Sequence, residues 1–72
     1  MKKTYVLEDL DCAHCAAKME EAIKKIDGVT FAGVNFIAQK LTVEADDNKF
    51  YDIMKEVKAV IKKIEPDCVV VD

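Results

Sequence analysis

Apolar side chains recur at helical spacing in two segments of this sequence, and the two stripes constrain the fold more than any other feature. The longer stripe predicts a helix over residues 49–64 and consists of Phe50, Ile53, Met54, Val57, Val60, Ile61 and Ile64. The shorter stripe predicts a helix that begins at about Ala13 and consists of Cys15, Met19, Ala22, Ile23 and Ile26. Gly28 follows it closely, and glycine favours the left-handed conformation in which many helices end. Each helix therefore needs an apolar surface to cover.

The segments outside these helices have the composition or the alternation of β-strands. They are residues 4–10, 29–36, 41–44 and 69–71. In the first of them, Tyr5 and Leu7 are expected to face the core. Pro66 separates the second helix from the last strand, because the residue before a proline avoids the helical conformation. The order βαββαβ predicts an α+β, ferredoxin-like sandwich, in which two helices cover one face of a four-stranded antiparallel sheet.

Composition limits both the size of the fold and the class of partner. A chain of 72 residues has enough material for one hydrophobic core, so residues 1–72 are expected to form a single domain. The net charge of -3 and the pI near 5.1 disfavour nucleic acid as a partner, since such binders carry basic patches. No apolar run approaches the ~18 residues that span a bilayer, and no secretory signal is visible. We expect a cytoplasmic chain that does not itself insert into a membrane.

Two thiols lie three positions apart where the first strand passes into the first helix. Cys12 and Cys15 can direct both sulfurs to one point if the first lies in a loop and the second opens the helix. Thiolates are the soft ligands that Cu(I), Zn(II) and Cd(II) bind. A helix N-terminus favours negative charge, so a lowered thiol pKa is expected at Cys15. The pair predicts an open metal site from which the ion can pass to another thiol pair.

Asp11 directly precedes this pair and offers a carboxylate oxygen. A divalent ion that takes about four ligands can use such an oxygen, whereas Cu(I) is satisfied by two or three soft ligands. Asp11 therefore favours Zn(II), Cd(II) or Pb(II). The alternative role for Asp11 is that of a helix N-cap, which accepts hydrogen bonds from free backbone N–H groups.

Cys68 and His14 are the two remaining candidates for ligation. The connection from the second helix to the last strand is expected at the same end of the sheet as the thiol loop, which places Pro66, Asp67 and Cys68 near it. Cys68 is therefore a candidate third sulfur ligand, although a cysteine outside a motif is more often a small buried apolar residue. His14 is expected to face solvent.

Residues 9–15, Asp-Leu-Asp-Cys-Ala-His-Cys, resemble the Gly-Met-Xaa-Cys-Xaa-Xaa-Cys motif of the heavy-metal-associated domain family. Further matches to that family are Ala22, Ile23, Ile26, Gly28, Val29, Val34, Asn35 and Val43. The resemblance implies a ferredoxin-like fold and a soft metal ion held by Cys12 and Cys15. It also implies a metallochaperone or an N-terminal domain of a P-type ATPase, with the transporter's membrane domains or another CxxC domain as partner. Asp11 and residues 63–67 look more like the zinc, cadmium and lead branch than the copper branch.

Two other functions compete with a divalent-metal domain of a transporter. A free-standing copper(I) metallochaperone would use the same two thiols. A dithiol-disulfide oxidoreductase would also carry a CxxC pair at a helix N-terminus, but it would begin with a parallel βαβ unit and usually place a proline against the disulfide. Pro66 is the only proline, and the expected element order differs. With one histidine and no nucleophile-base set visible, this domain is not expected to be an enzyme.

Overall fold

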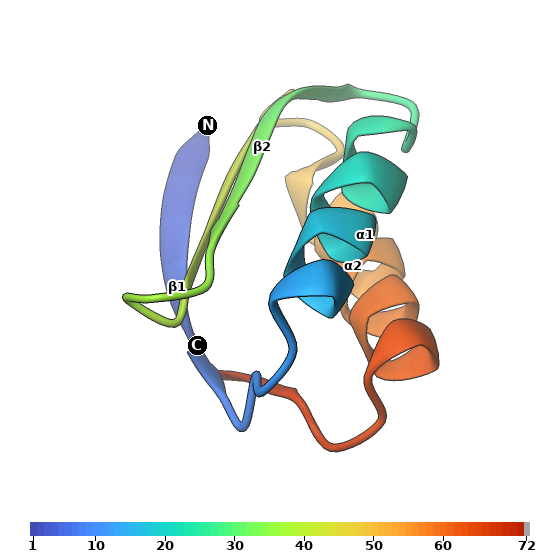
Figure 1. Ribbon diagram of the computed structural model, residues 1–72. Coiled ribbons are helices and arrows are strands. Elements are labelled where there is room, and N and C mark those ends of the chain that lie inside the picture. The colour runs from blue at the N-terminus through green and yellow to red at the C-terminus, as the bar shows by residue number, and fades with distance from the viewer. Residues whose placement is uncertain (72) are drawn as a thin grey trace.

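The computed structural model describes residues 1–71 as six elements in the order βαββαβ (Figure 1). The elements are β1 (Lys2–Glu8), α1 (Ala13–Lys24), β2 (Val29–Asn35), β3 (Lys40–Ala45), α2 (Phe50–Ile64) and β4 (Val69–Val71). The strands form one sheet in the order β2-β3-β1-β4, and each neighbouring pair is antiparallel. Both helices lie on the same face of this sheet. The expected ferredoxin-like sandwich is confirmed.

The end of β1 differs from the sequence prediction. The strand was expected to reach Leu10, but it ends at Glu8 because Asp9 has a φ of 62°, in the left-handed region. This turn directs Leu10 back into the core, where it is 2% exposed. The loop that carries the thiols therefore begins at Asp9, and the buried Leu10 side chain fixes its first residues to the core.

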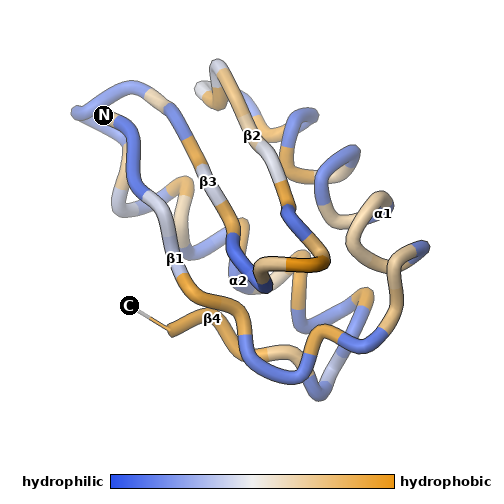
Figure 2. Tube along the Cα trace, turned by 60° about the vertical axis from the view of Figure 1, so that its left-hand side comes forward, coloured by the Kyte–Doolittle hydropathy of each residue, from blue (hydrophilic) through white to orange (hydrophobic). Residues whose placement is uncertain are grey.

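The core fills the space between the sheet and the helices. Its buried side chains are Leu7, Leu10, Ala16, Met19, Ile23, Ala32, Leu41, Val43, Ala45, Phe50, Ile53, Met54, Val57, Ile61 and Cys68. Figure 2 shows apolar and polar positions alternating along the elements that surround it. Complete burial of one large aliphatic side chain contributes roughly 1.5–3 kcal/mol, so the two helical stripes supply much of the stability. Neither helix among the described residues 1–71 is long and apolar enough to cross a membrane.

Gly28 allows the turn after α1 to pack tightly against α2. Its φ is +96°, and a β-carbon built there would lie 2.8 Å from Cδ1 of Ile53. A side chain would thus face both a disfavoured backbone conformation and a steric clash. Gly28 was expected to end the first helix, but α1 ends earlier, with Lys25 as its C-cap, and Gly28 instead allows the turn to lie against Ile53.

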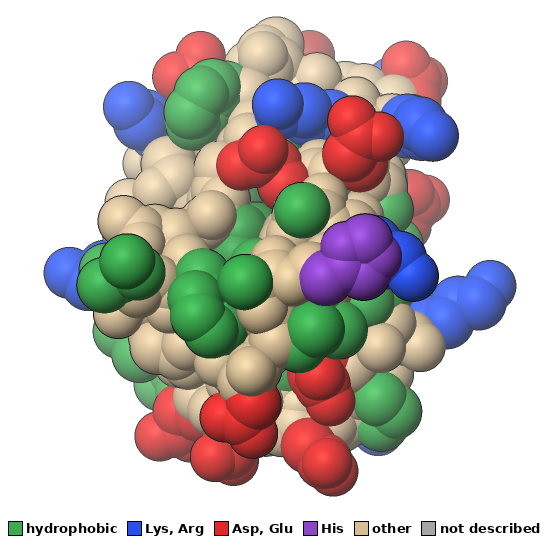
Figure 3. Space-filling view, viewed as in Figure 1, with side chains coloured by type: hydrophobic (Ala, Val, Ile, Leu, Met, Phe, Trp, Pro, Cys, Tyr) green, Lys and Arg blue, Asp and Glu red, His purple; other side chains and the backbone are tan. Residues whose placement is uncertain are grey.

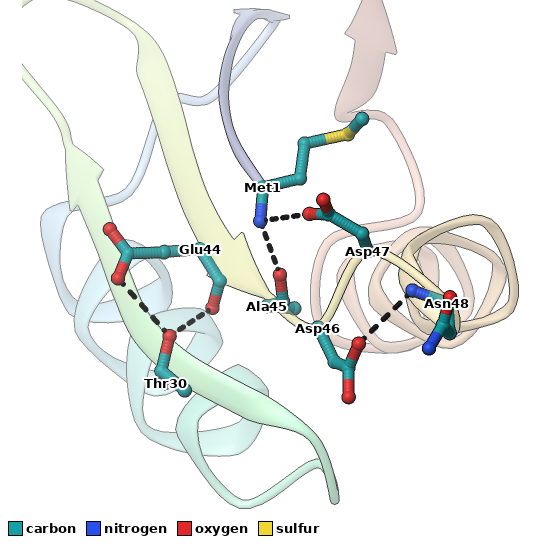
Figure 4. A network of polar contacts seen from close by, with 7 residues as sticks. All are labelled: Met1, Thr30, Glu44, Ala45, Asp46, Asp47 and Asn48. Atoms are coloured by element: carbon teal, nitrogen blue, oxygen red, sulfur yellow. Dashed lines mark hydrogen bonds and ion pairs between the residues drawn. The ribbon is translucent and has the colours of Figure 1, made fainter.

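The end of the sheet opposite the thiol loop is held by polar contacts (Figure 4). The amino group of Met1 donates a hydrogen bond to the carbonyl of Ala45 at 2.7 Å and forms an ion pair with Asp47. Thr30 Oγ1 donates to the carbonyl of Glu44 at 3.0 Å, which connects β2 to β3. These contacts hold the start of β1, the start of β2 and the end of β3 together, at the end of the sheet that lies far from the thiols.

Candidate metal centre

Cys12 is the N-cap of α1 and brings the two thiols together. Its backbone is extended, and its Sγ accepts a hydrogen bond from the backbone N–H of Cys15 at 3.2 Å. The carbonyl of Cys12 accepts the first helical hydrogen bond, from the N–H of Ala16 at 3.0 Å. The interpretation of Asp11 as the cap is therefore wrong, because the cap position falls one residue later. Asp11 is exposed at the entrance of the loop.

The two thiols titrate differently. A hydrogen bond from the Cys15 side chain, followed by the backbone N–H of Cys15, lowers the pKa of Cys12. The same thiol-thiol hydrogen bond, together with burial and the charge of Cys12, raises the pKa of Cys15 to about 11. A lowered pKa was expected at Cys15, and this was wrong because the capping sulfur belongs to Cys12. The helix N-terminus thus favours the thiolate of Cys12.

Glu65 is a residue of this site that the sequence prediction missed. After the Cys12 hydrogen bond and burial, the negative charge of Glu65 and a hydrogen bond to its carboxylate also raise the pKa of Cys15. Glu65 is the C-cap of α2, and its backbone N–H donates to the carbonyl of Ile61 at 2.8 Å. The sequence held one sign of this role. Glu65 precedes Pro66, at the end of a helix that was predicted to finish near the thiols.

Cys68 lies beside the thiol loop, as predicted, but inside the core. It is 5% exposed, and it directly precedes Val69, which pairs with Glu8 at the end of β1 where the thiol loop begins. Burial, and then the charges of Glu65, Asp9 and Asp11, raise its pKa. This environment favours the neutral thiol. A ligand role for Cys68 stays a prediction, and the exposed His14 faces solvent as expected.

Acidic side chains surround the thiol end of the molecule. Asp9, Asp11 and Asp67 are exposed, and Glu65 is partly buried. In Figure 3 acidic groups (red) gather at the lower end of the visible face, where Figure 1 places the β1-α1 loop and the turn after α2. Within residues 1–71, however, no three Cys, His, Asp or Glu side chains are grouped closely enough to hold a metal ion. The site is thus a pair of thiols with oxygen donors near its rim.

Comparison with known proteins identifies one family. The family model described as the heavy-metal-associated domain matches residues 4–68. The cadmium, zinc and cobalt-transporting ATPase of Bacillus subtilis (strain 168) is 41% identical over 66 residues, which are 92% of this chain and 9% of that protein. The copper chaperone CopZ of Staphylococcus aureus (strain JH9) is 42% identical over 43 residues, which are 60% of this chain and 63% of that protein.

A solved structure confirms the similarity of the fold. The structure titled CopZ metallochaperone superposes with a TM-score of 0.77 at 31% identity, covering 99% of this chain and 100% of that chain. The chain therefore matches a small chaperone along its whole length, but it spans about a tenth of the transporting ATPase that it resembles.

Proposed function

Because this chain belongs to the heavy-metal-associated domain family, we propose that it binds a soft divalent metal ion through the thiolates of Cys12 and Cys15. Zn(II), Cd(II) and Pb(II) are the favoured ions. The observation that carries the proposal is the contact of the Cys15 N–H with Cys12 Sγ, since it holds two sulfurs at one helix N-terminus. This position lowers the pKa of Cys12 and so favours its thiolate, which is the form that binds metal.

The choice of a divalent ion rests on oxygen donors close to the sulfurs. A two-sulfur site leaves a divalent ion short of the four ligands that it prefers. Asp11 precedes Cys12 in the loop, and Glu65 lies near enough to Cys15 for its carboxylate to help raise the pKa of that thiol. We assign Asp11 as the main oxygen ligand and Glu65 as a second candidate. Cys68 would have to leave the core to ligate.

The similarity to the Bacillus subtilis ATPase supports a place in a transporter. That relative is named for cadmium, zinc and cobalt. We infer that this chain is a cytoplasmic metal-binding domain of a P-type ATPase of this kind, which receives the ion or passes it to the membrane domains or to another CxxC domain. On this proposal, transport and ATP hydrolysis would reside in other parts of a longer protein.

The test is an equilibrium competition among Zn(II), Cd(II), Pb(II) and Cu(I) for the reduced protein, with X-ray absorption to count sulfur and oxygen neighbours. We expect one divalent ion per chain with two sulfur neighbours and at least one carboxylate oxygen. Cys12→Ser and Cys15→Ser should lose this binding, whereas the control Cys68→Ala should keep it. Binding of Cd(II) and Zn(II) that survives both serine substitutions would refute the assignment.

A second candidate function, copper(I) delivery, is supported by the full-length match to the CopZ metallochaperone structure. A Cu(I) ion needs only the two sulfurs, so the carboxylates of Asp11 and Glu65 would not be ligands in that role. Transfer experiments separate the two candidates. A chain that passes Cu(I) to a second CxxC domain, and whose Zn(II) affinity is unchanged in Asp11→Ala, would be a copper chaperone.

A further inference from the structure

Gln39, in the hairpin between β2 and β3, reaches across to the thiol loop. The backbone N–H of Leu10 donates to Gln39 Oε1 at 3.1 Å, and Gln39 Nε2 donates to the carbonyl of Leu10 at 2.6 Å. The same Nε2 donates to the carbonyl of Phe36 at 2.9 Å. One side-chain amide therefore satisfies both backbone groups of Leu10 and is itself tied to its own hairpin.

The backbone of Gln39 is fixed as firmly as its side chain. Its carbonyl accepts a hydrogen bond from the N–H of Leu7 at 2.7 Å, and its φ is 57°. A residue with a β-carbon disfavours this left-handed conformation, so local preference does not explain its presence here. The contacts with β1 and with Leu10 hold the conformation in place.

Leu10 is the residue through which these contacts act on the metal loop. It precedes Asp11 and lies two positions before Cys12. Its side chain is buried and its backbone is held by Gln39, so neither part can move without breaking core packing or hydrogen bonds. Because Leu10 is held in place, the position and direction of the backbone that enters Asp11 and Cys12 are fixed.

We propose that Gln39 is a positioning residue for the metal centre, which orders the loop before the ion arrives. The inference rests on the proposed function of Cys12 and Cys15 as ligands. A loop that is ordered in advance loses less conformational freedom when it binds, and the ion binds correspondingly tighter. Groups that orient metal ligands from outside the coordination sphere commonly contribute about 10–100-fold to affinity.

The first test compares Gln39→Met with Asn35→Ala. Methionine has a similar length and cannot make the two hydrogen bonds to Leu10. Asn35 Oδ1 accepts a hydrogen bond from the N–H of Ala38 at 2.9 Å, and this bond stays within the same hairpin, so its removal is a matched control. We expect Gln39→Met to weaken Cd(II) binding by about tenfold or more and to speed hydrogen exchange at the Leu10 amide. Asn35→Ala should stay within about twofold of the unmodified chain.

A second variant separates positioning from general stability. Gln39→Gly also removes the side-chain amide, but glycine accepts the left-handed conformation, which offsets part of the lost stability. We expect its metal-free melting temperature to lie near that of the unmodified chain while its Cd(II) affinity falls as in Gln39→Met. Unchanged Cd(II) affinity in Gln39→Gly, or unchanged Leu10 exchange in Gln39→Met, would overturn the positioning role. Failure of the unmodified chain to bind Cd(II) would instead overturn the proposed function.

Discussion

At the scale of single residues, the unequal thiols make metal binding depend on pH. The pKa of Cys12 is lowered by its hydrogen bonds from Cys15, and that of Cys15 is raised to about 11 by the same pairing. Near neutral pH, Cys15 is protonated in the metal-free chain, so an ion that takes both sulfurs must displace at least one proton. The affinity should therefore rise by at least about tenfold per pH unit near neutral pH, and more steeply wherever the Cys12 thiol is protonated as well and two protons leave.

Calorimetry in buffers with different ionisation enthalpies measures the protons released per ion. The ultraviolet absorbance of thiolate, followed during a metal-free titration, supplies the reference for each cysteine. Cd(II) binding at neutral pH that releases no proton would show that the Cys15 thiol is not a ligand or is already ionised.

Glu65 gives a second prediction at this scale. Glu65→Gln removes a negative charge and an oxygen donor, but it keeps the backbone hydrogen bond to Ile61. We expect Zn(II) and Cd(II) affinities to fall by about tenfold. Cu(I) affinity should change less, because two sulfurs suffice for that ion. Competition with chromophoric chelators measures all three.

Asp67→Asn is the matched control for Glu65→Gln, since Asp67 is an exposed carboxylate in the same turn. Loss of one solvent-exposed charge should affect all the cations weakly and to a similar degree. Equal losses of metal affinity in Glu65→Gln and Asp67→Asn would mean that Glu65 acts only through the overall negative charge at this end of the molecule.

At the scale of elements, Cys12 is both the N-cap of α1 and the first proposed metal ligand, and two substitutions separate these roles. Serine at position 12 can still accept the N–H of Cys15, whereas alanine cannot. Both Cys12→Ser and Cys12→Ala should lose metal binding. Only Cys12→Ala should also destabilise the metal-free chain, by about 1 kcal/mol, in chemical denaturation. Equal stability of the two variants would show that the sulfur contributes nothing as a cap.

The contact between the α1-β2 turn and α2 gives another prediction. Gly28→Ala introduces a β-carbon 2.8 Å from Ile53 Cδ1 at a φ of +96°, so we expect a loss of about 1–3 kcal/mol in the free energy of unfolding. Gly33→Ala is the control, because the nearest atom to its β-carbon would be Phe31 Cζ at 3.4 Å. Denaturation of the two variants side by side measures the difference. A Gly33→Ala loss as large as that of Gly28→Ala would contradict this account.

At the scale of the whole molecule, sequence patterns predicted the fold well because two amphipathic helices require one shared apolar surface. The α2 stripe placed its helix within one residue of the observed start at Phe50, and the element order placed Cys68 beside the thiol loop. The β1 end was missed because the left-handed Asp9 is invisible in an alternation pattern.

The parts of the site that sequence reasoning missed are contacts between segments far apart in the chain. Glu65 meets Cys15, and Gln39 meets Leu10, only after both helices and the β2-β3 hairpin have packed. The pKa order of the thiols depended on which cysteine occupies the cap. The start of α1 at Ala13 was predicted, but the hydrogen bonds between the two cysteines that lower one pKa and raise the other are not visible in the sequence.

The hydrogen bonds between the two cysteines have a consequence for how an ion would arrive. They lower the pKa of Cys12 and raise that of Cys15, so in the metal-free chain the Cys12 sulfur is the more readily ionised of the two. An incoming ion should therefore bond first to Cys12 and only then displace the proton of Cys15. Loading would thus proceed one sulfur at a time, in a fixed sequence.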